Sequence, residues 1–299
     1  MSLFSENEES PVSRRRFLTD ASAFAGYCLM NCEARAWQST TSRSVQIEKA
    51  LDDKNVIHGK VMFKSGDENL DAYLARPRRT GRFPVVIVIS GNSIYEEYIQ
   101  NLTAMLAQIA CIGIAPNIYS RQKDSMPLEQ KRRVLAEQTT DEKIFRDIES
   151  SIVYLKNKPF ADSRRVALTG FCFGGRCALM FAASYPKQVR AVVPFYGNLK
   201  TPAFANRKKD PIDVVENISA AVQGHYAEND NEIPSDQLKA FEIALKKNNK
   251  DDEIFTYPAV HGFFAYSRPT YDADAAKLAW QRTTTFLQNQ LAIKPPVRR

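Results

Sequence analysis

The sequence has few of the residues that build metal centres and disulfide frameworks. Its 299 residues include only three histidines and five cysteines, with no Cys-x-x-Cys pair and no histidine cluster. Two of the cysteines, Cys28 and Cys32, lie near the N-terminus, and the other three are an odd set. These counts indicate neither a zinc site nor a disulfide framework.

Long apolar runs, internal repeats and low-complexity linkers are also missing. The most apolar N-terminal stretch, residues 21–30, is too short and too polar to span a bilayer for long. The formal net charge of +7 could suggest an anionic partner, but no basic stripe is interleaved with aromatic residues and no nucleic-acid motif is present. The charge indicates at most a mild attraction for carboxylate substrates.

The first thirty-six residues carry the features of an export signal. Residues 13–18 read Ser-Arg-Arg-Arg-Phe-Leu, a modestly apolar stretch follows, and residues 34–36 read Ala-Arg-Ala. This order predicts a twin-arginine signal peptide at 1–36, and therefore a periplasmic or secreted protein that meets the twin-arginine export machinery. A lipoprotein anchor at Cys32 is a minor alternative, because Asn31 is larger than such processing prefers. The other alternative to an export signal is a basic disordered tail.

The remaining sequence suits an extension at 37–56 followed by one α/β domain at 57–299. Continuous β-branched runs, such as residues 85–89, are typical of strands buried on both faces of a parallel sheet. The alternation of strands and helices along the chain predicts a mostly parallel sheet with helices on both faces. Strands are expected at 57–63, 70–76, 85–89, 111–116, 166–169, 191–195, 218–226 and 253–257, and helices at 97–110, 128–156, 176–185, 234–247 and 271–291.

Cys172 stands where a sharp turn is expected between a strand and a helix. It lies in the run Gly-Phe-Cys-Phe-Gly-Gly at 170–175, after the apolar stretch 166–169 and before the helical stretch 176–185. This pattern is typical of a nucleophile elbow, whose flanking glycines allow close backbone approach. The helix N-terminus favours a thiolate, and the N–H of Phe173 is suited to bind an oxyanion.

The other reading of Cys172 is a small buried residue, since free cysteine is often buried. The strand, glycines and helix around it favour the nucleophile. Cys177 and Cys111 lie in apolar surroundings, and we expect both in the core.

A catalytic thiol needs a base, and only three histidines are available. His58 lies on the opening β pair, away from the turn, and His225 ends a strand. His261 lies in the loop after the last expected strand, where α/β-hydrolases carry their base. It could instead be an ordinary loop residue.

Asp230 falls between Cys172 and His261 in the chain, in the order nucleophile, acid, histidine. It follows a strand and could orient the imidazole, although aspartate is also common in polar turns. Glu228 and Glu232 are substitutes for this acid.

These motifs resemble the dienelactone hydrolase family of α/β-hydrolases, over most of residues 57–292. The likeness rests on Gly-Phe-Cys-Phe-Gly-Gly-Arg from residue 170, Phe-Tyr-Gly at 195–197, His-Tyr-Ala-Glu-Asn-Asp at 225–230, His-Gly-Phe at 261–263 and the segment 271–280. The exported branch with twin-arginine signals is the most similar. The resemblance implies the α/β-hydrolase fold and no metal or organic cofactor.

The same resemblance implies a triad of Cys172, His261 and Asp230. It also implies an oxyanion hole formed by the N–H groups of Phe173 and Asn92.

Two positions depart from the family pattern. The family glutamate that holds the resting cysteine corresponds to Gly91, and Glu96 or Glu97 could replace it from the next turn. The arginine that grips a substrate carboxylate in the type enzyme corresponds to Ala265, with Arg268 as the nearest alternative. Both departures leave substrate gating and the exact lactone open.

Three functions are compatible with these residues. The first is a thiol hydrolase of a small ester or lactone, and the second is a catalytically weak binding protein that kept the fold. The third is a redox or acyl-carrier role for Cys172. The loop 120–126 and the segment 198–214 are expected to cover the pocket and set its specificity. The oligomeric state is open.

Overall fold

The computed structural model describes residues 49–91, 96–122, 125–201 and 207–293. All of them belong to the second of two compact units, Val45–Arg299. The expected signal at 1–36 and the oxyanion candidate Asn92 lie outside the described residues.

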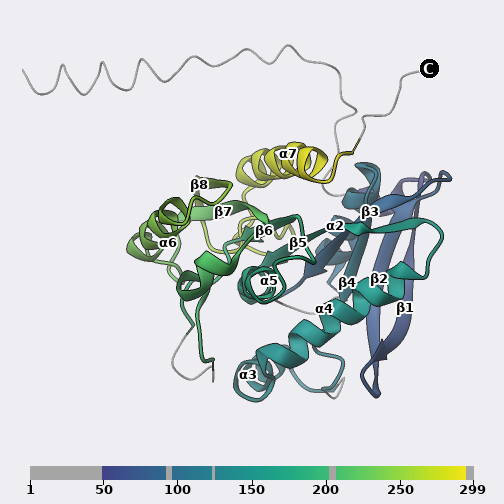
Figure 1. Cartoon of the computed structure of the whole chain (residues 1–299), viewed down its shortest axis with the longest axis horizontal. Helices are drawn as coiled ribbons and strands as arrows, with labels where there is room; N and C mark the ends of the chain where they lie inside the picture. Colours follow the sequence, from purple (N-terminus) through teal and green to yellow (C-terminus); the bar gives the residue numbers. More distant parts are fainter. Residues whose placement is uncertain (1–48, 92–95, 123–124, 202–206, 294–299) are drawn as a thin grey trace, which may run out of the picture. The chain divides into compact units, whose positions relative to one another are not determined.

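An eight-stranded sheet forms the centre of this unit, in the order β1-β2-β4-β3-β5-β6-β7-β8 (Figure 1). Only the pairs β1–β2 and β2–β4 are antiparallel, and the other five neighbouring pairs are parallel. The mostly parallel α/β fold predicted from the sequence is therefore confirmed. The strands are β1 (Val56–Ser65), β2 (Glu68–Pro77), β3 (Phe83–Ile89), β4 (Ile112–Pro116), β5 (Ala161–Phe171), β6 (Ala191–Phe195), β7 (Ala221–Asn229) and β8 (Asp252–Val260).

Burial of the strands follows their place in the sheet. Every residue of β3, β4 and β6 is buried, as expected for strands covered on both faces. The edge strand β1 instead alternates between more and less exposed residues. Apolar runs therefore form the middle of the sheet, and alternating sequence forms its edge.

Helices cover both faces of the sheet, with α4 and α5 on one side and α2 and α7 on the other (Figure 1). The helices are η1 (Ala50–Asp52), α2 (Glu97–Gln108), α3 (Leu128–Gln138), α4 (Asp141–Lys156), α5 (Phe173–Ser184), η2 (Pro211–Asn217), α6 (Ser235–Lys247) and α7 (Ala273–Gln290). No helix among the described residues is long and apolar enough to cross a membrane.

The helical residues expected at 128–156 form two helices, because α3 ends at Gln138 and α4 begins at Asp141. Thr140 is the N-cap of α4, and its side chain accepts a hydrogen bond from the Lys143 N–H at 3.4 Å. Threonine followed by two acidic residues is a favourable helix start, so this boundary could have been recognised in the sequence.

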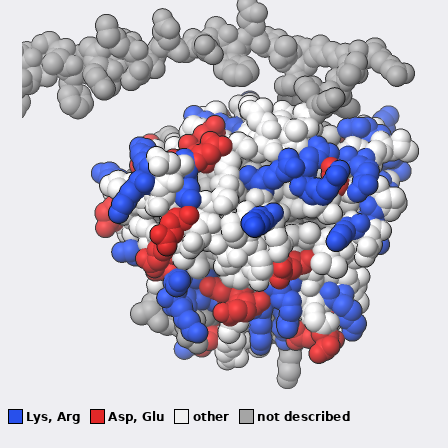
Figure 2. Space-filling view, in the orientation of Figure 1, with Lys and Arg blue, Asp and Glu red and all other residues white. Residues whose placement is uncertain are grey.

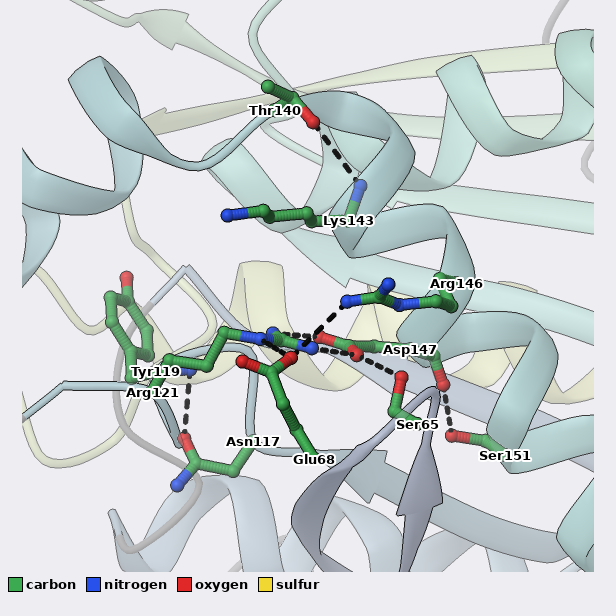
Figure 3. A network of polar contacts seen from close by, with 10 residues as sticks. All are labelled: Ser65, Glu68, Asn117, Tyr119, Arg121, Thr140, Lys143, Arg146, Asp147 and Ser151. Atoms are coloured by element: carbon green, nitrogen blue, oxygen red, sulfur yellow. Dashed lines mark hydrogen bonds and ion pairs between the residues drawn. The ribbon is translucent and has the colours of Figure 1, made fainter.

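A polar network around a buried ion pair ties the β1–β2 hairpin and the segment after β4 to α4 (Figure 3). Arg121, after β4, makes two bonds of 2.7 Å to the carboxylate of Asp147, whose side chain is fully buried. Ser65 donates to Asp147 at 2.6 Å, and Arg121 also reaches Glu68 at 2.6 Å. The network fixes the segment after β4 against the hairpin and the helix.

The order of the strands reverses between β3 and β5. From β3 the chain moves outward to β4 and then returns to the other side of β3 as β5. Open α/β sheets bind ligands beyond the carboxyl ends of the strands at such a point. Gly91 and Cys172 follow the ends of these two strands.

Charges on the face drawn in Figure 2 do not form a stripe of one sign. Lys and Arg gather most densely at the upper right of that view, whereas elsewhere Asp and Glu lie among them.

Candidate active site

Cys172 lies at the tip of the turn between β5 and α5. Its φ of 54° places a residue other than glycine in the left-handed region, which is strained and common at functional sites. Its N–H donates to the Phe195 carbonyl at 3.1 Å, and its carbonyl accepts from the Gly175 N–H at 2.9 Å. These backbone bonds hold the strained turn and present a partly exposed thiol.

Neighbouring backbone leaves no room for side chains on either side of Cys172. A Cβ at Gly170 would lie 2.2 Å from the Gly174 carbonyl oxygen, and one at Gly174 would lie 2.0 Å from that of Ile89. The collisions expected at both glycines are therefore confirmed. The close approach presses the start of α5 against the end of β3.

His261 and Asp230 come together beyond the ends of β8 and β7. The imidazole Nδ1 of His261 lies 2.9 Å and 3.1 Å from the two carboxylate oxygens of Asp230. The Asp230 side chain is almost fully buried, and that of His261 is 17% exposed. Bonded in this way, Nδ1 carries a proton, and Nε2 points away from the acid.

The same carboxylate also fixes the turn that follows it. Asp230 Oδ1 accepts from the backbone N–H of Glu232 at 2.8 Å and of Ile233 at 3.0 Å. Asp230 thus orients the imidazole and the turn that bears Glu232.

Cys172, His261 and Glu232 converge on the other side of the imidazole. The sulfur, His261 Nε2 and a carboxylate oxygen of Glu232 all lie within 4.8 Å of one another. The Glu232 oxygen is 3.8 Å from the sulfur and 3.6 Å from Nε2. Of the three acids considered for His261, Asp230 meets Nδ1, whereas Glu232 lies on the sulfur side.

The surroundings of His261 change its pKa. Desolvation by burial alone would lower it, but Asp230 and the Cys172 sulfur outweigh this effect and raise the pKa to about 10. Tyr196 packs beside the imidazole, with 4.9 Å between ring centroids. The imidazole is held in place and favours its protonated form.

Asn198 is a further neighbour of the sulfur, with its Oδ1 3.8 Å from Cys172 Sγ. The segment that it begins is anchored by Arg176, which is fully buried on α5. The Arg176 guanidinium makes bonds of 2.8 Å and 3.0 Å to Asp141 and donates to the Lys209 carbonyl at 2.9 Å. A buried charge pair next to the elbow therefore positions part of the expected pocket cover.

The expected oxyanion donor Phe173 lies beside the end of β3. Phe173 is the first residue of α5, so its N–H belongs to the unpaired first turn of the helix. Across from it, a Cβ at Gly91 would lie 3.5 Å from the Phe173 nitrogen. The hydroxyl of Tyr119 donates to the Gly91 carbonyl at 2.7 Å and fixes this strand end.

The carboxylates that could replace the missing family glutamate have other partners. Glu96 lies 3.4 Å from the guanidinium of Arg268, and Glu97 accepts from the Tyr266 hydroxyl at 3.2 Å. In the described part of the chain, the carboxylate at the sulfur is that of Glu232. A substrate carboxylate at Arg268 would compete with Glu96.

The remaining histidines lie elsewhere, as expected from the sequence. His58 contacts the Tyr73 hydroxyl at 2.5 Å on the edge hairpin. His225 is fully buried and bonds Tyr257 at 2.8 Å.

The cysteines Cys111 and Cys177 are buried in the core, also as expected. Burial raises the pKa of both thiols, which keeps them protonated.

Three functional candidates were not identified in these roles from the sequence: Glu232 at the sulfur, Asn198 and Tyr119. Glu232 was considered only as the acid for His261. Its position two residues after Asp230 was a signal, but the direction of a side chain in a turn is set by the turn itself.

Comparison with known proteins gives one consistent result. Residues 70–291 match the family model described as "Dienelactone hydrolase family". A protein of Yersinia pestis named "Putative carboxymethylenebutenolidase" is 35% identical over 229 residues, which cover 75% of this chain and 85% of the relative. A Bradyrhizobium protein named "Probable 2-oxo-3-(5-oxofuran-2-ylidene)propanoate lactonase" is 31% identical, over 78% of this chain and 94% of that one.

A solved structure supports the same likeness. The crystal structure of a "Putative Dienelactone Hydrolase" from Klebsiella pneumoniae superposes with a TM-score of 0.73 and 33% sequence identity. The match covers 80% of this chain and 99% of the other. Sequence and fold therefore agree over the described unit.

Proposed function

This chain belongs to the dienelactone hydrolase family, and from that premise we propose that it hydrolyses a small carboxylic ester or lactone through a Cys172–His261–Asp230 triad. A family of carboxylic ester hydrolases supports the reaction class, and relatives named for lactone hydrolysis support the substrate class. The acid and the alcohol of the substrate are open.

In the resting pair, the shared proton resides on His261. The raised pKa of about 10 supports this arrangement, since His261 then stays protonated near neutral pH. The nucleophile is the thiolate form of Cys172, which attacks the substrate carbonyl carbon.

The attack forms a tetrahedral intermediate whose oxyanion needs hydrogen-bond donors. The N–H of Phe173 supplies one, and the N–H of Asn92 is proposed as the second. When the intermediate collapses, His261 Nε2 gives its proton to the leaving alkoxide, and an acyl-cysteine thioester remains.

Water then releases the acyl group. Neutral His261 accepts the proton of the attacking water, the second tetrahedral intermediate forms, and its collapse expels the thiolate. Asp230 keeps the imidazole in one orientation and stabilises its charged form. No redox partner is consumed.

One observation carries the proposal. The strained turn presents Cys172 towards His261, whose other nitrogen is held by the buried carboxylate of Asp230 at 2.9 Å. A cysteine that was only a packing residue would need neither the strain nor the oriented imidazole.

The test is turnover of activated esters and small lactones by purified, reduced protein. Cys172→Ala should abolish turnover, and His261→Ala should lower kcat by about 10²–10⁴-fold, the usual contribution of a general acid–base. His58→Gln is the matched control, because His58 lies on the edge hairpin and should leave turnover unchanged. Turnover that survives in Cys172→Ala would refute the thiol mechanism.

The alternative is a binding protein that kept the fold. Gly91 in place of the family glutamate favours it, because one carboxylate near the nucleophile is then missing. The two functions differ in thiol reactivity. If the parent turned over no substrate and iodoacetamide left Cys172 unmodified near neutral pH, the binding protein would be favoured.

We also propose export by the twin-arginine route, with cleavage after Ala36. The paired arginines at 14–15, the apolar stretch and the Ala-Arg-Ala site support it. A double substitution of Arg14 and Arg15 by lysine should retain the full-length protein in the cytoplasm. Unchanged accumulation of a processed form in the periplasm would contradict the proposal.

A further inference from the structure

We propose that Cys172, His261 and Glu232 together form a binding site for a zinc ion, which reversibly blocks the nucleophile. The three donors come from different loops, so no spaced motif announces the site in the sequence. The block of hydrolysis rests on the proposed function, whereas the binding of the metal does not.

The donor set is the first argument. A thiolate sulfur, an imidazole nitrogen and a carboxylate oxygen are the three ligand types that zinc takes in proteins, and three protein ligands leave a fourth position for water. Hard cations such as Mg²⁺ prefer oxygen ligands throughout. The chemistry of the cluster therefore selects a borderline-soft divalent ion.

The spacing of the donors is the second argument. With ordinary bond lengths, ligand atoms around tetrahedral zinc are about 3.3–3.6 Å apart. The Glu232 oxygen is 3.6 Å from His261 Nε2 and 3.8 Å from Cys172 Sγ, and the third separation is within 4.8 Å. Small rotations of these side chains are enough to close on an ion.

The support behind the ligands is the third argument. A histidine that binds zinc usually donates its other N–H to a carboxylate, which fixes the ring and raises its basicity. Asp230 does this for His261 at 2.9 Å and also holds the backbone N–H of Glu232 at 2.8 Å. One buried carboxylate thus positions two of the three ligands.

The fourth argument concerns how an ion can reach the donor atoms and which partners those atoms already have. His261 Nε2 is buried and has no hydrogen-bond partner among the described residues. Once its proton is displaced, its lone pair can bind a metal. The Glu232 side chain is 54% exposed, which gives an ion a route from solvent. Binding displaces the one proton that the Cys172–His261 pair shares, and the ion then covers the sulfur that would attack substrate.

The first experiment measures binding without reference to turnover. Untagged, reduced protein is titrated with Zn²⁺ by calorimetry and with Co²⁺ by absorbance, where a sulfur-to-cobalt charge-transfer band reports thiolate ligation. Glu232→Gln should weaken binding at least about tenfold, the loss that even an outer partner of a metal site produces. With Cys28 and Cys32 replaced by serine, Cys172→Ser should remove the charge-transfer band, since Cys111 and Cys177 are buried.

Glu228→Gln is the matched control, because Glu228 is exposed nearby in the chain and is not one of the three clustered donors among the described residues. It removes the same charge and should leave Zn²⁺ affinity unchanged. Equal affinity in Glu232→Gln and the parent, or a cobalt band that survives in Cys172→Ser, would overturn the proposed site.

The second experiment measures hydrolysis with Zn²⁺ or Mg²⁺ at equal concentration, followed by a chelator. Zn²⁺ should inhibit, Mg²⁺ should not, and the chelator should restore turnover. Binding of zinc by a protein that hydrolyses no ester would sink the proposed function and leave the metal site standing. Hydrolysis that is unaffected by saturating Zn²⁺ would overturn the inhibitory role.

Discussion

Gly91 lies so close to the elbow that a Cβ at position 91 would stand 2.8 Å from the carbonyl oxygen of Phe171. The same Cβ would lie 3.3 Å from the Cβ atom of Cys172. The glycine therefore does more than omit a glutamate, because its backbone occupies space next to the nucleophile. The carboxylate near the sulfur comes instead from Glu232, on the turn after β7.

This contact predicts that position 91 tolerates no side chain. Gly91→Ala should lower both kcat and the free energy of unfolding, because either Phe171 or the end of β3 must shift. Gly91→Glu, which restores the family residue, should not raise turnover. Gly59→Ala is the control, since a Cβ there meets nothing within 4 Å. Higher turnover in Gly91→Glu would show that the strand end can make room.

Much of this site could be predicted because it depends on chain order. Strand, glycines and helix around Cys172 impose a sharp turn, and parallel strands bring Asp230 and His261 to the same edge of the sheet. These positions follow from backbone connectivity alone.

Glu232 shows where such prediction ends. Asp230 bonds the backbone of this turn locally, but the Glu232 side chain reaches the sulfur only because the sheet brings the turn after β7 beside the elbow, 60 residues away in the chain. Arg176 is similar, because its charge is buried only when Asp141, from another helix, pairs with it. Side-chain positions that depend on distant partners are not contained in local patterns.

His261 should titrate well above an ordinary histidine. Its pKa, raised to about 10, should appear as a high midpoint in the imidazole NMR signals, measured with a chelator present. Cys172→Ala should lower this midpoint, because the sulfur is one of the groups that raise it. A midpoint near 6.5 in the parent would contradict the proposed charged pair.

The same shift predicts a direction for stability. A raised folded pKa contributes stability that is complete below about pH 6.5 and is lost as pH rises to about 10. The difference in free energy of unfolding between the parent and His261→Gln should therefore shrink over that range. A difference in unfolding free energy that stays constant with pH would show that His261 has the same pKa in the folded and unfolded protein.

His225 predicts the opposite slope in acid. Burial lowers its pKa to about 3, so the folded protein keeps it neutral while the unfolded chain gains a proton below about pH 6.5. As pH decreases through this range, this group should lower the free energy of unfolding by up to about 1.4 kcal/mol per pH unit. In urea titrations, His225→Gln should flatten the acid slope between pH 6 and pH 4. Equal slopes in both proteins would contradict the neutral buried state.

The pair Arg121–Asp147 predicts a large coupling in a double-mutant cycle. Asp147 is fully buried and receives two bonds of 2.7 Å from Arg121, which is itself mostly buried (Figure 3). Asp147→Leu or Arg121→Met alone should cost about 3–5 kcal/mol of unfolding free energy, because each removes the buried partner of the other charge. The double variant should cost clearly less than the sum of the two. Arg133–Glu137 is the control cycle, since this solvent-screened pair on α3 should show little or no coupling. Additive losses at Arg121 and Asp147 would mean that the network fixes geometry without depending on the pairing of its charges.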